Sequence, residues 1–325
     1  MTSHFTKPEL KALTRLRAGF LNGSNAGGGY WRDETDLELY DKTFGERIGW
    51  KWDAVFGELE TVGWQPQSTQ VLDWGCGSGI AGRRALSQWP QLTSLSVHDV
   101  SGPALAFATR KARERYPTHS VDQHYANTPL KPGTLLLISH VINELSENSI
   151  SRLASLVEQA TEVIWVEAGS HADSRSLIQM RERLRGKFRI ILPCPHQSAC
   201  GLLAAKNEQH WCHHFARIPS HAFQDGLWAQ FSRELGIDLG TLPYSFLVLS
   251  KAGLAVQNPE DARIVGRPRE EKGRMKVLTC QETGVTDITL QKRDDPQLYK
   301  ALHKDRIASR YRWRIEDGKI LGDVQ

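Results

Sequence analysis

The sequence has no long hydrophobic run, few cysteines and almost no net charge. No stretch of its 325 residues approaches the roughly eighteen apolar residues of a membrane span, so we expect no transmembrane helix. Charged side chains from Lys7 to Arg17 interrupt any apolar core, which argues against a secretory signal, and a mitochondrial presequence is not favoured either. Five cysteines without an export signal also argue against a disulfide framework.

The small positive charge is unevenly distributed. The formal net charge is +4, and residues 251–325 contain 16 Lys or Arg against 12 Asp or Glu, whereas the rest of the chain is balanced. A basic C-terminal segment suits a surface that faces nucleic acid or a ribosome. An excess of this size also arises by chance, so charge alone does not decide the partner.

A glycine-rich loop after a short apolar strand is the clearest motif. Residues 71–79 read VLDWGCGSG, with Gly75, Gly77 and Gly79 just before an expected helix. Glycine permits sharp turns and close approach of a ligand to the main chain, and a helix N-terminus offers free N–H groups. About twenty residues later a second expected strand ends in Asp99, an acid that can bind two ribose hydroxyls.

Two nucleotide cofactors fit this pattern. The spacing Gly77-x-Gly79-x-x-Gly82 satisfies the dinucleotide fingerprint, so NAD is one candidate. The fuller pattern, which begins at Asp73, resembles motif I of the class I methyltransferases, which bind S-adenosylmethionine (SAM). The resemblance implies that Asp73 helps to hold the methionine amino group, that the loop glycines face the cofactor and that Asp99 binds its ribose. A glycine-rich turn that binds nothing is the third alternative.

Strands and helices alternate along the middle of the chain. The seven expected strands are 70–74, 95–97, 121–125, 135–139, 163–167, 188–192 and 245–250. Such alternation predicts βαβ units, a parallel sheet and a ligand crevice at the carboxyl ends of the strands. The predicted fold class is therefore α/β, a doubly wound sheet like that of the class I SAM methyltransferases. This resemblance implies that the last strand lies antiparallel beside the sixth.

Three regions are expected along the chain. Residues 1–66 read as an N-terminal helical region, residues 67–251 as a SAM-binding Rossmann-like domain with a cysteine-rich insertion at 193–215, and residues 252–325 as a basic, β-rich appendage. Within the appendage we expect three short strands and one basic helix, at 264–267, 276–280, 286–290 and 299–312, respectively.

Four of the five cysteines lie in the second half of the chain. Five residues separate Cys194 from Cys200, eleven separate Cys200 from Cys212, and Cys280 stands alone in the appendage. Four thiolates with one distant member suit a metal centre that attaches the appendage to the core domain. Long, unequal spacings favour an iron–sulfur cluster over zinc, whose ligands usually come in close Cys pairs. Cys76 belongs to the glycine loop and is not an expected ligand.

Two alternatives to the iron–sulfur cluster stay open. Spare imidazoles near the cysteines, those of His196, His210, His213 and His214, leave a zinc site with three cysteines and one histidine as an alternative. The other alternative is four buried cysteines without a metal, since free cysteine is commonly buried.

Taken together, the motifs resemble those of one family. The segments that carry the resemblance are the glycine loop, Ser139–Leu145, Glu167–Gly169, Pro193–His196 and Trp211–Phe215. They look like the Rsm-type methyltransferase-like proteins of the mitochondrial small ribosomal subunit and their bacterial relatives, from about residue 40 to the expected C-terminal basic helix.

This family resemblance implies a class I methyltransferase-like protein that carries a four-cysteine iron–sulfur cluster of the 4Fe-4S type. It also implies association with the small ribosomal subunit and its rRNA, and a role in assembly of that subunit. Cys194, Cys200 and Cys212 match the cluster motif of the family, and Cys280 matches by its order and setting.

The sequence assigns no catalytic residue. Amino-methylating class I enzymes carry an Asn/Asp-Pro-Pro-aromatic motif after the fourth strand, where this chain has SHVINE at 139–144. His140, Asn143 and Glu144 either contact a substrate or cap the following helix, and we favour the cap. For Cys76, packing against the cofactor is favoured over a role as methyl acceptor.

Three functions therefore fit the motifs of this sequence. The chain is an rRNA methyltransferase of the small subunit, an assembly factor that binds SAM and rRNA without transferring a methyl group, or an NAD-dependent oxidoreductase with an iron–sulfur centre. We expect a bacterial cytoplasmic protein, with the mitochondrial matrix as the alternative. The sequence does not indicate an oligomeric state.

Overall fold

The computed structural model describes residues 4–22, 29–126, 128–252, 258, 260–308 and 310–323. The chain forms two compact units, which are described separately. The first unit comprises Met1–Glu60, Gln65–Glu167 and Phe215–Leu242, and the second comprises Thr61–Trp64, Ala168–His214 and Pro243–Gln325. The domain limits expected from the sequence, at residues 66 and 251, stay predictions.

The first unit combines an N-terminal set of helices with a parallel sheet. Its elements are α1 (Lys7–Asn22), α2 (Glu34–Tyr40), a π-helical turn (Asp41–Gly45), α3 (Glu46–Thr61), β1 (Gln70–Trp74), α4 (Ile80–Gln88), β2 (Ser94–His98), α5 (Gly102–Arg115), β3 (Ser120–Gln123), β4 (Thr134–Ser139), a 3-10 turn (Ile142–Glu144), α6 (Glu147–Val157), β5 (Glu162–Ala168), α8 (His221–Gln224) and α9 (Gly226–Leu235).

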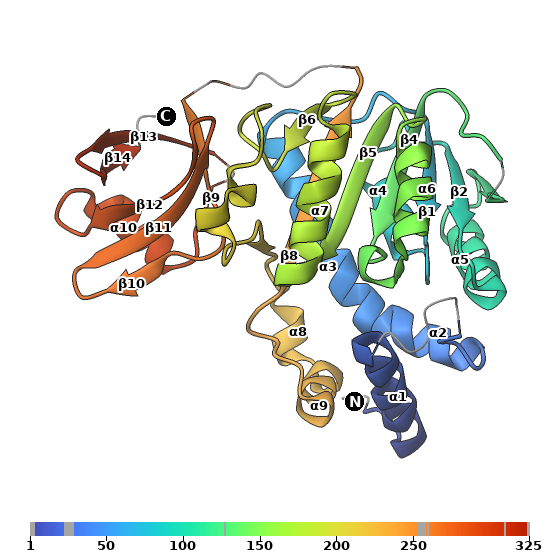
Figure 1. Cartoon of the computed structure of the whole chain (residues 1–325). Helices are drawn as coiled ribbons and strands as arrows, with labels where there is room; N and C mark the ends of the chain where they lie inside the picture. Colours follow the sequence, from blue (N-terminus) through green and yellow to red (C-terminus); the bar gives the residue numbers. More distant parts are fainter. Residues whose placement is uncertain are drawn as a thin grey trace. The chain divides into compact units, whose positions relative to one another are not determined.

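The sheet of the first unit has the order β3-β2-β1-β4-β5, and all its strand pairs are parallel. Helices α4, α5 and α6 run alongside the strands (Figure 1). β4 and β5 are buried along nearly their whole length, as strands covered on both faces must be. The strand order reverses between β1 and β4, which is where α/β sheets bind their ligands. The expected class I methyltransferase fold is confirmed.

Capping residues in the sequence mark where helices of the first unit begin. The Ser101 side chain caps α5 by accepting from the backbone N–H of Ala104, and a proline lies in the first turn of this helix. The expected N-terminal helical region is also confirmed. Its buried Asp36 forms an ion pair with Arg15, and Arg17 donates to the carbonyl oxygen of Leu235 at the end of α9.

The second unit contains one long helix, a cysteine-bearing loop and mostly antiparallel strands. Its elements are α7 (His171–Leu184), β6 (Arg189–Leu192), two 3-10 turns (Gly201–Leu203 and Ala205–Asn207), β7 (His214–Phe215), β8 (Pro243–Ser250), β9 (Asp261–Ile264), β10 (Arg269–Glu271), β11 (Arg274–Gln281), β12 (Gly284–Gln291), α10 (Pro296–His303), β13 (Tyr311–Glu316) and β14 (Lys319–Asp323).

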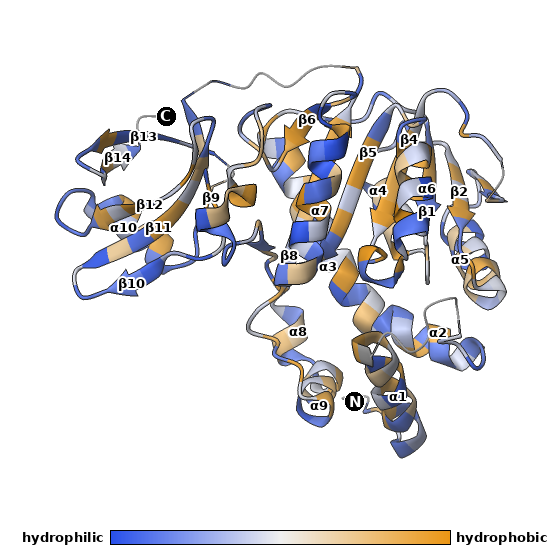
Figure 2. Cartoon of the chain, in the orientation of Figure 1, coloured by the Kyte–Doolittle hydropathy of each residue, from blue (hydrophilic) through white to orange (hydrophobic). Residues whose placement is uncertain are grey.

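Two strand arrangements organise the second unit. β6 pairs antiparallel with β8, as the family resemblance implied. The C-terminal strands form a six-stranded sheet in the order β10-β11-β12-β14-β13-β9, which β9 and β11 close by pairing. Its interior holds apolar side chains such as Ile264, Val277 and Leu290, and α10 contributes Leu302. In Figure 2, α7 shows alternating blue and orange bands, the pattern of a helix with one polar and one apolar side.

One expectation for the C-terminal region is wrong. The basic helix expected over 299–312 is shorter, because α10 ends at His303 and β13 begins at Tyr311. Asp305 has a φ of 52°, a left-handed conformation that a helix cannot contain. Beyond it, Tyr311 pairs with Ala262 of β9, so the sheet rather than the helix takes up this segment. The expected β-rich character of the region is confirmed.

In the part of the chain that the structure describes, every helix is too short or too polar to cross a lipid bilayer.

Candidate functional sites

The glycine loop joins β1 to α4 with three left-handed residues. Gly75, Gly77 and Gly79 have φ values of 70°, 52° and 79°. A Cβ at position 75 would lie 2.6 Å from Cγ1 of Val141, and one at position 79 would lie 2.9 Å from Cβ of Ala108. A Cβ at position 77 would have no neighbour within 4 Å. Gly77 is therefore required for its backbone conformation, and it faces open space.

Backbone hydrogen bonds fix the loop against the end of β2. The N–H groups of Gly75 and Cys76 both donate to the carbonyl oxygen of His98, at 2.8 and 2.9 Å. The N–H of Gly77 donates to Oδ2 of Asp99 at 2.8 Å, and the N–H of Ser101 donates to Oδ1 of the same carboxylate at 2.8 Å. The acid predicted for ribose binding thus stands beside the loop with a fixed orientation.

A pocket lies at the carboxyl ends of β1, β2 and β4. Gly75, Gly77 and Asp99 line it, so the structure brings together three of the five residues predicted for SAM. His140 and Glu144, from the stretch after β4, line it as well.

An aromatic wall, which we define as Phe20, Tyr30, Trp31 and Tyr40, also lines the pocket. These side chains contact one another, with ring centroids of Trp31 and Tyr40 4.9 Å apart and those of Phe20 and Tyr30 5.1 Å apart. Sequence reasoning missed this wall. Its only signal is a high density of aromatic residues in the N-terminal region, which does not reveal the pocket that they reach.

Asp73 and Gly79 lie behind the loop rather than among the residues that line the pocket. Asp73 is fully buried, and its Oδ2 accepts from the N–H of Gly82 at 2.8 Å. Its Oδ1 has no hydrogen-bond partner in the described part of the chain. Burial raises the pKa of Asp73 to about 7, and only the Gly82 N–H and the charge of Arg83 oppose this shift substantially. Gly79 precedes the first turn of α4.

The stretch after β4 is held by a buried acid. One carboxylate oxygen of Glu167 accepts from the N–H groups of Val141 and Ile142 and from Nε1 of Trp165. The expected capping role of His140, Asn143 or Glu144 is wrong, because Ser146 caps α6 by accepting from the N–H of Ser149. This serine follows the predicted stretch directly and is itself a preferred cap residue.

His140 and Cys76 are both poor candidates for direct chemistry. His140 has a φ of 54°, and its Nε2 lies 3.2 Å from Nζ of Lys51. Burial and this ammonium lower the pKa of His140 well below its usual range. The Cys76 thiol does not line the pocket, and burial raises its pKa well above the usual range, so it stays a thiol rather than a nucleophilic thiolate.

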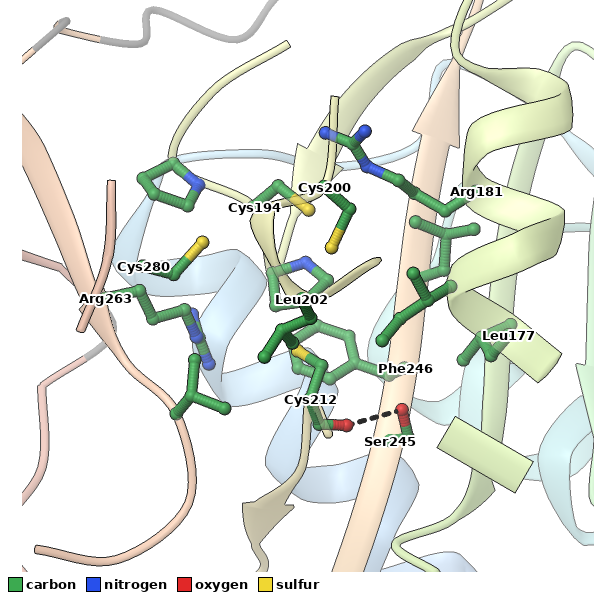
Figure 3. A pocket seen from close by; sticks show the side chains of 15 residues that line it. Leu177, Arg181, Cys194, Cys200, Leu202, Cys212, Ser245, Phe246, Arg263 and Cys280 are labelled. Atoms are coloured by element: carbon green, nitrogen blue, oxygen red, sulfur yellow. Dashed lines mark hydrogen bonds between the residues drawn. The ribbon is translucent and has the colours of Figure 1, made fainter. Parts of the chain in front are cut away.

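The second unit contains a pocket that all four predicted cysteines line. Cys194 follows β6, and Cys200 and Cys212 flank the two 3-10 turns. Cys280 lies in β11, and 68 positions separate it from Cys212 in the sequence. Their sulfurs point into one space in Figure 3. The structure therefore brings Cys280 to the other three, and none of the four forms a disulfide.

Two buried arginines accompany the cysteines. Arg181 of α7 is 2% exposed and interacts electrostatically with Cys194, and Arg263 of β9 is 4% exposed. Both line the pocket (Figure 3). Nε of Arg181 has no hydrogen-bond partner among the described residues. Buried cations at this position would offset the negative charge of bound thiolates.

The remainder of the pocket is largely apolar. Leu177, Leu202, Phe246 and Val265 line it. Burial raises the pKa of Cys200 to about 11 and raises those of Cys212 and Cys280 further, with the neighbouring cysteines adding to the effect. These thiols would have to lose their protons to bind a metal.

No group of three or more His, Cys, Asp or Glu side chains in the described ranges is close enough to hold one metal ion. A tetrahedral zinc site needs each sulfur about 2.3 Å from the metal. Two imidazoles contact cysteine sulfurs, with Nε2 of His196 3.5 Å from Sγ of Cys280 and Nε2 of His214 3.7 Å from Sγ of Cys212.

The loop that carries Cys200 packs tightly against the β11–β12 hairpin. A Cβ at Gly201 would lie 2.8 Å from the backbone nitrogen of Val285. Nδ2 of Asn207 donates to the carbonyl oxygen of Gly201 at 2.8 Å, and Oγ of Ser245 donates to that of Cys212 at 2.9 Å. The cysteines are thus fixed by backbone contacts and not only by their own side chains.

Comparison with known families identifies the chain. It matches the family described as mitochondrial small ribosomal subunit Rsm22 over residues 55–312, and it belongs to that family. A search of curated proteins gives no match.

Several solved structures are similar to this chain. The 16S rRNA methylase RmtB has 19% identity and a TM-score of 0.35, with 58% of this chain and 70% of that chain covered. An rRNA methylase from Escherichia coli has 20% identity and a TM-score of 0.36, with coverage of 57% and 70%. A magnesium protoporphyrin IX methyltransferase from Synechocystis PCC 6803, with bound SAM, has 12% identity and a TM-score of 0.39, with coverage of 77% and 100%. The fold assignment rests on strand order and not on these scores.

Replacement of Asp73 by Asn should make the stability of the protein less dependent on pH. The carboxyl group of the unfolded chain ionises near pH 3.9, about the value for an isolated aspartate. The folded protein retains this proton until about pH 7. Between these values the unfolded state binds fewer protons, so the wild type loses stability relative to Asp73→Asn as the pH rises. Urea unfolding of the ligand-free proteins at pH 5 and pH 7.5 measures this difference.

The matched control is Asp122→Asn, which changes an exposed carboxylate in β3. Its unfolding free energy should follow that of the wild type at both pH values. Parallel behaviour of Asp73→Asn and the wild type would contradict the buried, proton-retaining state of Asp73.

Proposed function

We propose that this chain is a SAM-binding, iron–sulfur protein with a methyltransferase fold that acts on the small ribosomal subunit and its rRNA during assembly. The observation that carries the proposal is the open pocket beside Gly77 and Asp99, at the strand-order reversal of a chain that belongs to the Rsm22 family. The basic C-terminal region, with its net excess of four positive charges, supports an rRNA-facing surface.

SAM is the cofactor that this pocket supports best. Asp99 has each oxygen engaged by one N–H, and each oxygen has a further lone pair for a ribose hydroxyl. The aromatic wall supplies faces for the cationic sulfonium group, which interacts favourably with aromatic rings. Asp73, behind the loop, would act by holding Gly82 and the start of α4 rather than by direct contact. NAD is the competing cofactor, since the glycine spacing alone admits it.

Asp99→Asn should weaken SAM binding about tenfold. The amide retains one acceptor oxygen but loses the charge, and hydrogen bonds to charged groups contribute about 1.5–3 kcal/mol. Isothermal titration of wild type, Asp99→Asn and the exposed control Asp122→Asn with SAM measures the change. Unchanged affinity in Asp99→Asn would remove Asp99 from the site, and tight NADH binding without SAM binding would overturn the cofactor.

An iron–sulfur cluster of the 4Fe-4S type is the metal centre that the second pocket supports. Four cysteines line it, which is the number of thiolate ligands that a 4Fe-4S cluster takes. The residues that would hold it are Cys194, Cys200, Cys212 and Cys280. When bound, the cluster would supply a cross-link between the loop and β11, and Arg181 and Arg263 would balance its charge. Zinc is the competing metal.

Cys280→Ser should lower the iron and sulfide content of anaerobically purified protein and abolish most of its brown absorption, because one of four ligands is lost. The same change should expose the C-terminal region to limited proteolysis. The matched control is Cys76→Ser, a buried cysteine outside the pocket, which should retain iron and sulfide. Equal iron and sulfide in both variants would contradict the ligand role of Cys280. Colourless wild-type protein with stoichiometric zinc would overturn the cluster.

Methyl transfer distinguishes the two roles that this proposal allows. His140 and Glu144 line the pocket, which favours chemistry on a substrate, whereas the missing proline pair of amino-methylating enzymes favours assembly without transfer. The assay mixes the protein with labelled SAM and isolated small-subunit particles. At SAM concentrations near the dissociation constant of the wild type, label that enters rRNA with wild type and more slowly with Asp99→Asn identifies a methyltransferase, and binding of particles without label identifies an assembly factor.

The proposal also includes a cellular compartment and a division of the chain into three regions. The family's description names the mitochondrial small subunit, which supports the matrix alternative over the bacterial cytoplasm. The division into a helical region, a SAM-binding domain and a basic appendage, at residues 66 and 251, is retained as a proposal.

A further inference from the structure

A chain of three polar side chains leads into the cysteine pocket. Nη2 of Arg263 lies 3.3 Å from Nδ1 of His214, and Nε2 of the same imidazole lies 3.7 Å from Sγ of Cys212. Arg263 and His214 are 4% and 9% exposed. Three residues from β9, β7 and the preceding loop are therefore joined in a row inside the second unit.

The first contact fixes the proton of the imidazole. A guanidinium group has only donors, so Nδ1 of His214 must accept from Arg263. A neutral imidazole has one N–H, and when Nδ1 accepts, that N–H is on Nε2. The Nε2 proton then lies between the ring and the Cys212 sulfur, within the distance of a hydrogen bond to sulfur.

Neighbouring aromatic rings hold this row in place. The guanidinium carbon of Arg263 lies 5.5 Å from the centroid of the Phe246 ring, a cation–π contact. The same ring packs edge-on against His214, with centroids 5.3 Å apart, and the tilted ring of Tyr244 also contacts the imidazole, with centroids 5.9 Å apart. Neither Arg263 nor His214 can turn toward water without leaving these contacts.

We propose that Arg263 locks His214 as the Nε2–H tautomer and that His214 donates a hydrogen bond to the sulfur of Cys212, which makes both residues positioning residues of the metal centre. The sulfur electrostatics that this implies rest on the cluster in the proposed function, whereas the tautomer does not. A donor on a ligating sulfur stabilises the more negative, reduced state of an iron–sulfur cluster.

The tautomer is tested without a cluster. Histidine ring ¹⁵N shifts are measured on the full chain with reduced cysteines, and the signal of His214 is assigned from its loss in His214→Gln. We expect an Nε2–H signal in the wild type and its loss or mixing in Arg263→Met. An Nδ1–H tautomer in the wild type would overturn the inference.

The effect on the centre is tested on anaerobically purified, cluster-loaded protein. His214→Phe keeps the ring packing and removes the donor, and His214→Gln restores an N–H near the Nε2 position. At a fixed ambient potential set with dithionite, the ratio of reduced to oxidised cluster should fall about 2- to 10-fold in His214→Phe, since one hydrogen bond contributes about 0.5–1.5 kcal/mol. His214→Gln should recover most of this loss.

His171→Phe is the matched control, because His171 is an exposed histidine of the same unit whose Nε2 bonds to the carbonyl oxygen of Glu208. Its ratio should equal that of the wild type. Equal ratios in His214→Phe and wild type would overturn the donor role even if the tautomer is as proposed. An Nε2–H signal in a wild-type protein that forms no cluster would leave the Arg263–His214 lock standing and refute the cluster.

Discussion

Four cysteines that line one largely apolar pocket, with Cys280 buried and the other three partly buried, are the constraint on which the second unit depends. Burial raises the pKa values of Cys200, Cys212 and Cys280, so the pocket does not favour free thiolates. Two buried arginines line the same space, and one of them, Arg181, is paired with Glu182. Their charges would offset the negative charge of thiolates in this pocket. The close approach of Gly201 to Val285 places the loop that carries Cys200 against the hairpin that carries Cys280.

The two pockets are built in different ways. In the first unit, backbone conformation positions the glycine loop, because three left-handed glycines and the carbonyl oxygen of His98 determine the path of the loop. In the second unit, side chains from α7, the cysteine loop, β8, β9 and β11 must meet. A backbone-built site follows from a short contiguous motif, whereas a side-chain-built site depends on the folding of distant segments.

This difference explains what the sequence could predict. Gly75, Gly77 and Asp99 were found from local spacing, and β1 ended where the motif required. Cys280 was proposed as the distant member of a set of four cysteines, and the family resemblance supported it by order and setting, because no local motif marks it as a ligand. The aromatic wall was missed, since Phe20 and Trp31 reach the pocket only after α1 and α2 have packed. The helix expected over 299–312 failed because pairing of Tyr311 with β9 outweighed local helix propensity.

The backbone that follows β4 is fixed by hydrogen bonds, and this limits what the side chains there can do in the first pocket. Glu167 binds the N–H groups of Val141 and Ile142, which fixes the backbone that carries His140 and Glu144. Burial and Lys51 lower the pKa of His140, so its imidazole is a weak proton acceptor. Loss of water around Glu144 raises the pKa of its carboxyl, and Tyr30 of the aromatic wall only partly opposes this by hydrogen bonding. Compared with exposed side chains of the same type, Glu144 is thus the better proton acceptor and His140 the poorer one.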